Sequence, residues 1–185
     1  MAEEITSELG LYRSRGYKDY SLGHQKMYTG PVELLTNEKQ RFRVLDVGTG
    51  IGFGLRRMVD ANVLESYVGI EANRETFDYV SGLPWPAHVK IHFGSWLDLP
   101  DDALEPADYG FCIEVIEHIE EPLVAPFLAK LRRNVKRNLF LSTPDIRETT
   151  HGTATADEWR VRIKAAGFSE VAIVGSQWTT LFVCE

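Results

Sequence analysis

The chain has 185 residues, of which 44% are hydrophobic and 25% are charged, and these values are typical of one globular domain. Lysine and arginine number 20 against 27 acidic residues, and the resulting net charge of −7 argues against non-specific nucleic-acid binding, which needs a basic surface. No apolar run reaches the roughly 20 residues that span a membrane. The segment MAEEITSELG lacks the basic and apolar parts of a secretory signal, so we expect a cytoplasmic protein.

From residue 42 onward, short apolar segments alternate with segments of helical pattern. Strands are expected at residues 42–48, 66–72, 89–95, 108–115, 138–144, 170–177 and 179–185. Helices are expected at residues 49–62, 74–83, 121–135 and 155–168, the last with the capping signal Thr155-x-x-Glu158 and a stop at Gly167. The alternation predicts an α/β fold with a doubly wound, mostly parallel seven-stranded sheet and a C-terminal antiparallel hairpin.

The two cysteines, Cys112 and Cys184, both lie in apolar segments. A cysteine in an apolar segment usually behaves as a small apolar residue, so we expect both thiols to be buried and unreactive. The sequence contains no CxxC-type pair of the kind that binds zinc. Two unpaired thiols without a secretory signal also fit a reducing cytoplasm.

A glycine-rich loop, Asp46-Val47-Gly48-Thr49-Gly50-Ile51-Gly52-Phe53-Gly54, directly follows the first expected strand. Glycines at such a point let the chain turn tightly and let a ligand approach the backbone. The dinucleotide fingerprint GxGxxG fails from Gly48, where Phe53 takes the last glycine position, and from Gly50, where Leu55 does. A phosphate-binding P-loop also fails because no GK[ST] follows. The loop therefore predicts a ligand site of another kind at the carboxyl end of the sheet.

The segment VLDVGTGIGFG resembles motif I of the class I S-adenosylmethionine (SAM)-dependent methyltransferases. The segments YVGIEAN, FGSWLDLP, CIEVIEHI and LFLSTPD follow in the order in which that family places its next four strand ends. The resemblance covers residues 42–185, which we expect to form the SAM-binding catalytic domain. It implies that the chain transfers a methyl group from SAM to an acceptor.

The resemblance also implies which residues hold the cofactor. Glu71 lies about 20 residues beyond the glycines, where a carboxylate accepts hydrogen bonds from both ribose hydroxyls. Asp46 orders the loop and helps to hold the methionine portion, directly or through water. Many relatives carry an aspartate where this chain has Ser95, so the adenine contacts fall to the Trp96 backbone and to Asp98, while Trp96 also suits the core. The expected cofactor set is Asp46, Gly48, Gly50, Gly52, Glu71, Ser95, Trp96, Asp98 and Glu114.

Glu114, Glu117 and His118 have the spacing i, i+3, i+4, which places them on one face if a helical turn follows the fourth strand. Two carboxylates and an imidazole suit Mg, Mn or a similar divalent ion. EVIEH resembles the metal site of ubiquinone-biosynthesis O-methyltransferases and of small-RNA 3′-terminal 2′-O-methyltransferases, which implies His151 as a fourth ligand. Without a metal, Glu114 borders the methyl site, and either Glu114 or His118 is the candidate base.

The sequence is compatible with three functions. The first is methyl transfer to an oxygen or nitrogen of a small molecule, which the acidic stretch from Asp98 to Glu121 favours because it repels phosphates. The second is methylation of an RNA 3′ end, for which a basic cluster could hold the backbone: Lys130, Arg132, Arg133, Lys136 and Arg137. The third is a SAM-binding module without turnover. A dinucleotide oxidoreductase is disfavoured by the failed fingerprint.

Residues 1–41 are polar and rich in turn-forming residues. Within them Tyr17, Tyr20, His24 and Tyr28 recur at near-helical spacing, which predicts an amphipathic helix. Such a helix either packs on the sheet or closes over the acceptor as a lid.

Overall fold

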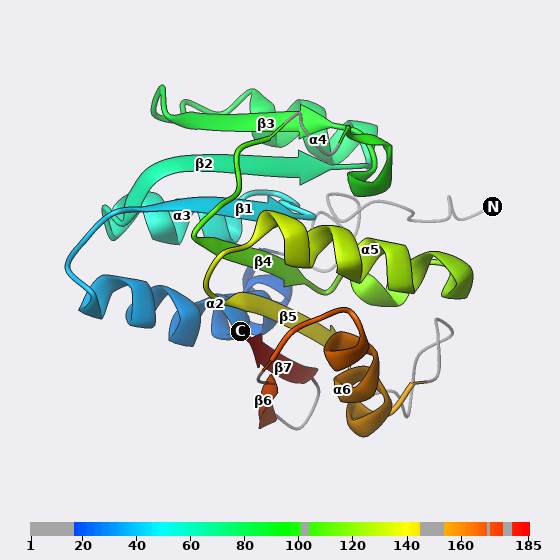
Figure 1. Ribbon diagram of the computed structural model, residues 1–185. Coiled ribbons are helices and arrows are strands. Elements are labelled where there is room, and N and C mark those ends of the chain that lie inside the picture. The colour runs from blue at the N-terminus through cyan, green and yellow to red at the C-terminus, as the bar shows by residue number, and fades with distance from the viewer. Residues whose placement is uncertain (1–16, 101–103, 145–153, 170, 176–178) are drawn as a thin grey trace.

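The computed structural model describes residues 17–100, 104–144, 154–169, 171–175 and 179–185 (Figure 1). Its strands are β1 (Phe42–Val47), β2 (Leu64–Glu71), β3 (Val89–Phe93), β4 (Tyr109–Ile113), β5 (Leu139–Pro144), β6 (Val171–Gly175) and β7 (Thr179–Cys184). Its helices are α2 (Tyr17–Asn37), α3 (Phe53–Asp60), α4 (Arg74–Ser81), α5 (Glu121–Asn134) and α6 (Ala156–Ala165), with short 3-10 turns η1 (Trp96–Asp98) and η2 (Ile116–His118). Among the described residues, no helix is both long and apolar enough to cross a membrane.

The seven strands form one sheet in the order β3-β2-β1-β4-β5-β7-β6. Strands β1 to β5 run parallel to one another, whereas β7 is antiparallel to both β5 and β6. The predicted sheet and its C-terminal antiparallel hairpin are therefore confirmed. Because β1 pairs with both β2 and β4, the strand order reverses at β1, which is where sheets of this type bind ligands.

Local signals set the ends of the helices. Gly52, in a left-handed conformation, is the N-cap of α3, so this helix begins at Phe53, within the glycine-rich segment. The side chain of Asn73 accepts a hydrogen bond from the Thr76 N–H at the start of α4. At α6 the predicted capping box between Thr155 and Glu158 is present, and Gly167, at φ 100°, follows the end of the helix.

Two apolar clusters lie on opposite faces of the sheet. On one face α2 and α3 pack against Phe42, Val44 and Phe111, and the Tyr28 ring stacks on Phe111 with centroids 5.7 Å apart. On the other face α5 and α6 cover β4, β5 and β7, and this cluster includes both predicted buried thiols, Cys112 and Cys184. Burial raises the pKa of Cys112 well above its ordinary range and that of Cys184 to about 12, so both thiols are inert.

The helix α2 packs on the sheet through Tyr28, Val32 and Leu35, which are buried. Gly54 makes this approach possible, because a Cβ atom at that position would lie 2.1 Å from the Tyr28 ring. The side chains of Tyr17, Tyr20 and His24 lie outside the described set, so the lid function stays a prediction.

One part of the sheet differs from the doubly wound pattern, in which helices cover both faces. The connection between β3 and β4 forms only the turn η1 in its described part, residues 94–100 and 104–108. In Figure 1, α5 and α6 lie on the near side of the sheet, and among the described residues the β3–β4 connection, but no helix, crosses in front of β2 and β3. We call this surface of β2 and β3, on the side of α5, the open face.

Candidate functional site

The glycine loop after β1 is built from left-handed backbone. Gly48, Gly50 and Gly52 have φ values of 83°, 56° and 86°, which residues with a side chain adopt only at a cost. Gly48 also meets the chain after β4, because a Cβ atom there would lie 2.2 Å from Val115 Cγ2. Position 48 therefore requires glycine and the other two positions favour it, so the loop turns tightly with few side chains at the reversal of the strand order.

Glu71 ends β2 and is tied to this loop. Its Oε2 accepts a hydrogen bond of 2.9 Å from the Gly50 N–H, and its Oε1 accepts one of 2.7 Å from the Asn73 N–H. The residue is only 8% exposed, and burial raises the pKa of its carboxyl group although the backbone hydrogen bonds oppose the rise. The carboxylate is thus held between the loop and the start of α4.

Asp46 lies beneath the loop and is completely buried. Its Oδ2 accepts a hydrogen bond of 2.6 Å from the Tyr67 hydroxyl, and its carbonyl oxygen accepts one of 3.3 Å from Thr49 Oγ1. Its Oδ1 is buried without a hydrogen-bond partner among the described residues. Burial and then the charge of Glu71 raise the pKa of Asp46 to about 7.

The predicted adenine contacts occupy the turn η1. Ser95 caps this turn by accepting a hydrogen bond from the Leu97 N–H, and Asp98 is exposed. Trp96 is 3% exposed and belongs to the core, and its Nε1 has no hydrogen-bond partner in the described part of the chain. The alternative that Trp96 is a core residue therefore holds for its side chain.

Lys130 of α5 binds the backbone of this turn. Its Nζ donates hydrogen bonds to the carbonyl oxygens of Trp96, at 2.7 Å, and of Leu99, and lies 4.7 Å from the centre of the Trp96 ring. Lys130 is only 4% exposed. The expectation that it belongs to a surface basic cluster is therefore wrong, because its ammonium group replaces water by two carbonyl oxygens and a ring face.

The chain after β4 holds the predicted catalytic and metal-binding residues, in a geometry that differs from a regular helical turn. Glu114 has a left-handed conformation at φ 56°, and only Ile116–His118 form the 3-10 turn. The Ser142 hydroxyl of β5 donates a 2.7 Å hydrogen bond to Glu114 Oε1. The Glu114 carboxylate is thus bound to β5, and the regular helical turn that would place Glu114, Glu117 and His118 on one face does not begin at Glu114.

Glu117 and His118 nevertheless remain adjacent. Glu117 Oε1 lies 4.0 Å from His118 Nε2, and Glu117 Oε2 is buried without a hydrogen-bond partner in the described ranges. Burial and then the charge of Glu114 raise the pKa of Glu117 to about 8. The described residues contain no group of three or more acids, histidines or cysteines arranged for a metal, and His151 lies outside them.

Four buried or half-buried carboxylates therefore gather at the carboxyl ends of β1, β2 and β4: Asp46, Glu71, Glu114 and Glu117. We call this set the acidic edge. The pKa of each of the four is raised by burial. Such a set attracts a cationic ligand, because a nearby positive charge stabilises the ionised carboxylates.

Three residues support this site in roles that the sequence did not predict: Tyr67, Lys130 and Ser142. Their partners lie on other elements, so no local spacing revealed them. For Tyr67 a weak signal existed, because a tyrosine in an otherwise apolar central strand needs a partner for its hydroxyl group.

Solved structures resemble this fold closely. Magnesium protoporphyrin IX methyltransferase (ChlM) from Synechocystis PCC 6803 with bound SAM superposes with a TM-score of 0.71 at 16% identity, over 90% of this chain and 81% of that one. The methyltransferase domain of bacterial CtHen1 gives 0.70 at 20% identity, over 87% and 97%. The Hen1-containing RNA repair complex with Pnkp1 and Rnl gives 0.63 at 18% identity, over 85% and 41%. Neither a protein-family model nor a curated protein sequence matches the chain significantly.

The fold is therefore that of class I SAM-dependent methyltransferases, as the order of the sequence motifs indicated.

Proposed function

We propose that the chain binds SAM at the acidic edge and transfers its methyl group to an oxygen or nitrogen of an acceptor. The observation that carries this proposal is the bonding of the Glu71 carboxylate to the Gly50 N–H, within a loop of three left-handed glycines at the reversal of the strand order. SAM is a cation, and the acidic edge offers it a negative field. The loop offers backbone that a nucleoside can approach closely.

Each part of the cofactor has a proposed partner. Glu71 accepts the ribose hydroxyls, for which its oxygens have lone pairs beyond the two backbone hydrogen bonds. Gly48, Gly50 and Gly52 contact the ligand through their backbone, while Asp46 acts from beneath the loop through its charge or through a bridging water, because it has no exposed surface. On the adenine side, Ser95, the Trp96 backbone and Asp98 border the base.

Methyl transfer from a sulfonium is an in-line displacement, so the protein chiefly aligns the acceptor with the methyl group. A hydroxyl or ammonium acceptor must also lose a proton. Glu114 is the proposed base: it borders the methyl site, and burial raises its pKa toward the working range of a general base. The Ser142 hydroxyl orients this carboxylate. His118, which is 59% exposed at its side chain, is the alternative base.

Mg or Mn is compatible with the same residues. Glu117 supplies a buried oxygen that lacks a partner, its other oxygen lies 4.0 Å from His118 Nε2, and Glu114 lies beside them. Carboxylate oxygens and an imidazole are suitable donors for such ions, and His151 would be the fourth. When bound, a divalent ion would lower the pKa of an acceptor hydroxyl.

A small-molecule acceptor is favoured over RNA. Of the basic residues that could hold an RNA backbone, Lys130 is buried and Arg137 forms a 2.8 Å ion pair with Glu38. Arg132 donates to the Gly167 and Val135 carbonyl oxygens. The acidic edge itself repels phosphates. The alternative, methylation of an RNA 3′ end, draws support from the similarity to the Hen1 domain.

The first test measures SAM binding by calorimetry. We expect Glu71→Ala to weaken SAM binding about tenfold or more, because a buried charged acceptor of two hydroxyls is lost. Glu65→Gln, on the exposed part of the same strand, is the matched control and should leave the affinity unchanged. Equal SAM affinity of the wild type and Glu71→Ala would contradict the ribose assignment.

The second test separates an enzyme from a binding module without turnover. Radiolabelled SAM is incubated with pools of phenols and amines or with RNA oligonucleotides, with and without Mg or Mn. A labelled small-molecule product supports the proposal. Label at RNA 3′ ends alone would replace it with the alternative, and activity that survives exhaustive chelation would exclude the metal.

We also propose that residues 1–41 close over the acceptor. Cofactor plus acceptor should then slow proteolysis of residues 1–30, whereas an unchanged cleavage rate would leave α2 as a packing helix only.

A further inference from the structure

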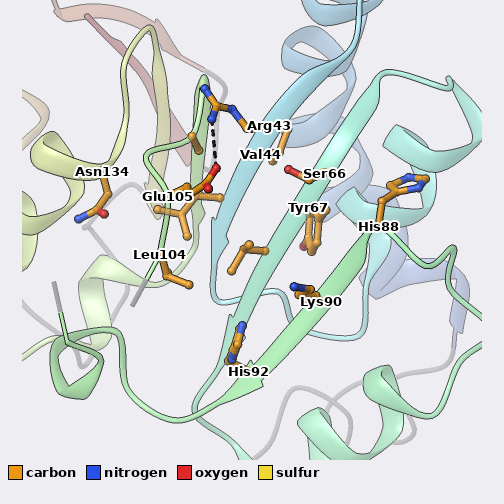
Figure 2. A pocket seen from close by; sticks show the side chains of 13 residues that line it. Arg43, Val44, Ser66, Tyr67, His88, Lys90, His92, Leu104, Glu105 and Asn134 are labelled. Carbon is orange, nitrogen blue, oxygen red and sulfur yellow. Dashed lines mark hydrogen bonds and ion pairs between the residues drawn. The ribbon is translucent and has the colours of Figure 1, made fainter. Parts of the chain in front are cut away.

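The open face of β2 and β3 contains a hollow of about 500 Å³ that lies apart from the acidic edge (Figure 2). Its floor is apolar and includes Leu45 of β1, Val68 of β2 and Leu104. None of the four carboxylates of the acidic edge lines it. A volume of this size falls within the range of pockets that hold small organic ligands, roughly 300–1,000 Å³.

The rim of the hollow is basic, although the chain as a whole has a net charge of −7. Lys90 and His92 of β3 and the preceding His88 line it, and Arg43 lies across from them on β1. Arg43 is partly neutralised by ion pairs with Glu105 at 3.4 Å and Asp108 at 3.8 Å. The side chains of His88, Lys90 and His92 make no hydrogen bond or ion pair with any other residue that the structure describes.

The sequence of β3 accounts for this arrangement. Strand residues alternate between the two faces of a sheet, and His88, Lys90 and His92 alternate with Val89, Ile91 and Phe93. Lys90 pairs in register with Val68 and His92 with Ile70, so these two basic side chains point to the same face as the apolar floor. The opposite side of β3 carries the apolar residues and meets α4, where Phe77 lies 5.5 Å from Phe93.

We propose that this hollow is a second ligand site, which binds an organic anion with an apolar body and a phosphate or carboxylate head group. The head group would lie against Lys90 and the neighbouring imidazoles, and the body would cover Leu45 and Val68. Single-stranded nucleic acid fits less well, because bases stack best on exposed Phe, Tyr or Trp rings and the one such residue that lines the hollow, Tyr67, is fully buried. The site does not depend on whether the acidic edge binds SAM.

The experiment uses three probes that share one apolar body: naphthyl phosphate, naphthylacetate and the uncharged naphthylethanol. Each is titrated into the full chain, with and without SAM, while NMR follows the backbone amide signals. We expect saturable binding of the two anions, with changes in the amide chemical shifts of residues 88–92 and 66–68. The alcohol should bind more weakly by about tenfold or more. The tighter of the two anions identifies the head group.

Variants make the assignment specific. Lys90→Glu should weaken anion binding about tenfold or more, since it reverses the charge nearest the head group, and His92→Gln should weaken it less. Lys164→Glu makes the same charge change on the exposed surface of α6 and should have no effect. Replacing both Asp101 and Asp102 by asparagine should also leave the affinity unchanged. If this double variant bound the anions much more tightly than the wild type, the chain's own acids would be the groups that compete for the site.

Three results would overturn the proposal. They are shifts that cluster away from the hollow, equal binding of the alcohol and the anions, and anion binding that Lys90→Glu leaves intact. Saturable shifts at residues 88–92 with RNA oligonucleotides but with none of the naphthyl probes would assign the surface to nucleic acid instead.

Discussion

The acidic edge and the open face lie on the same sheet but are built in opposite ways. At the acidic edge the carboxylates are buried or half-buried, two of their oxygens lack a hydrogen-bond partner among the described residues, and burial raises all four pKa values. On the open face, basic side chains reach solvent around an apolar floor, and none of the four acids is present. Within one small domain, a cationic ligand is therefore favoured at one region and an anionic ligand at the other.

The difference also has a thermodynamic side. Buried charged groups without partners destabilise a fold until a ligand neutralises them, whereas exposed charges cost almost nothing. Substitutions at the acidic edge should therefore change stability and cofactor affinity together. Substitutions on the open face should change neither.

The largest expected effect concerns Asp46. Its carboxyl pKa is raised from an ordinary 3.8 to about 7, so the folded chain keeps a proton that the unfolded chain loses as the pH rises from about 4 to 7. Each unit of pKa difference corresponds to about 1.4 kcal/mol. The free energy of unfolding should therefore fall by on the order of 4 kcal/mol across this range and then level off. Denaturant unfolding of wild type and Asp46→Asn, compared at each pH, measures this fall as their difference.

Two further variants sharpen the pH test. Tyr67→Phe removes a hydrogen bond that lowers the pKa of Asp46, so the fall should continue to higher pH. Asp60→Asn, on the exposed surface of α3, is the control and should parallel the wild type. If the free energy of unfolding changes equally with pH in wild type and in Asp46→Asn, the charge of the Asp46 carboxylate is neutralised in the folded chain. The neutralising group would then lie outside the contacts that Asp46 makes with the described residues.

The next effect tests the glycine loop. Gly48→Ala places a Cβ atom 2.2 Å from Val115 Cγ2 at a φ of 83°, so overpacking and left-handed strain should together destabilise the fold by about 2–4 kcal/mol. SAM binding should be lost with it. Gly30→Ala, where no atom lies within 4 Å of the added Cβ, should be neutral or stabilising. Adding Val115→Ala to Gly48→Ala should restore part of the stability; no recovery would mean that backbone strain alone is responsible.

A smaller effect is expected at Lys130, which links α5 to the turn η1. Lys130→Met removes the donor to the Trp96 and Leu99 carbonyl oxygens and should destabilise the fold by about 1–3 kcal/mol. Thermal and denaturant unfolding would measure this, with the exposed Lys136→Met as the control. Equal stability of the two variants would show that water replaces the ammonium group at no cost.

The smallest effect should come from the open face. Lys90→Gln should change the free energy of unfolding by no more than about 0.5 kcal/mol, because Lys90 is exposed and has no polar partner among the described residues. Its SAM affinity should equal that of the wild type. A clear loss of SAM affinity in this variant would show that the open face and the acidic edge are energetically coupled.

The order of the elements and much of the site could be predicted from local patterns along the chain. Alternating apolar segments predicted the strands, and the glycine spacing predicted a ligand loop that follows β1. The position of Glu71 at the end of β2 predicted a ribose-binding carboxylate at this edge of the sheet. In the structure the carboxylate accepts a hydrogen bond from the Gly50 N–H, and its contact with the ribose stays a prediction. These features are local: they follow from side-chain period, turn conformation and the rule that parallel strands end at one edge.

The contacts between side chains of different elements became visible only in the folded chain. Tyr67 reaches Asp46, Lys130 reaches η1, and Ser142 donates a hydrogen bond to Glu114, and each pair joins residues more than 20 positions apart in the sequence. The open face was also invisible, although β3 alternates basic and apolar residues, because the alternation says that one face is polar without saying that no helix covers it. Such contacts depend on strand order and on which connection forms a helix, and neither is written in the spacing of residues along the chain.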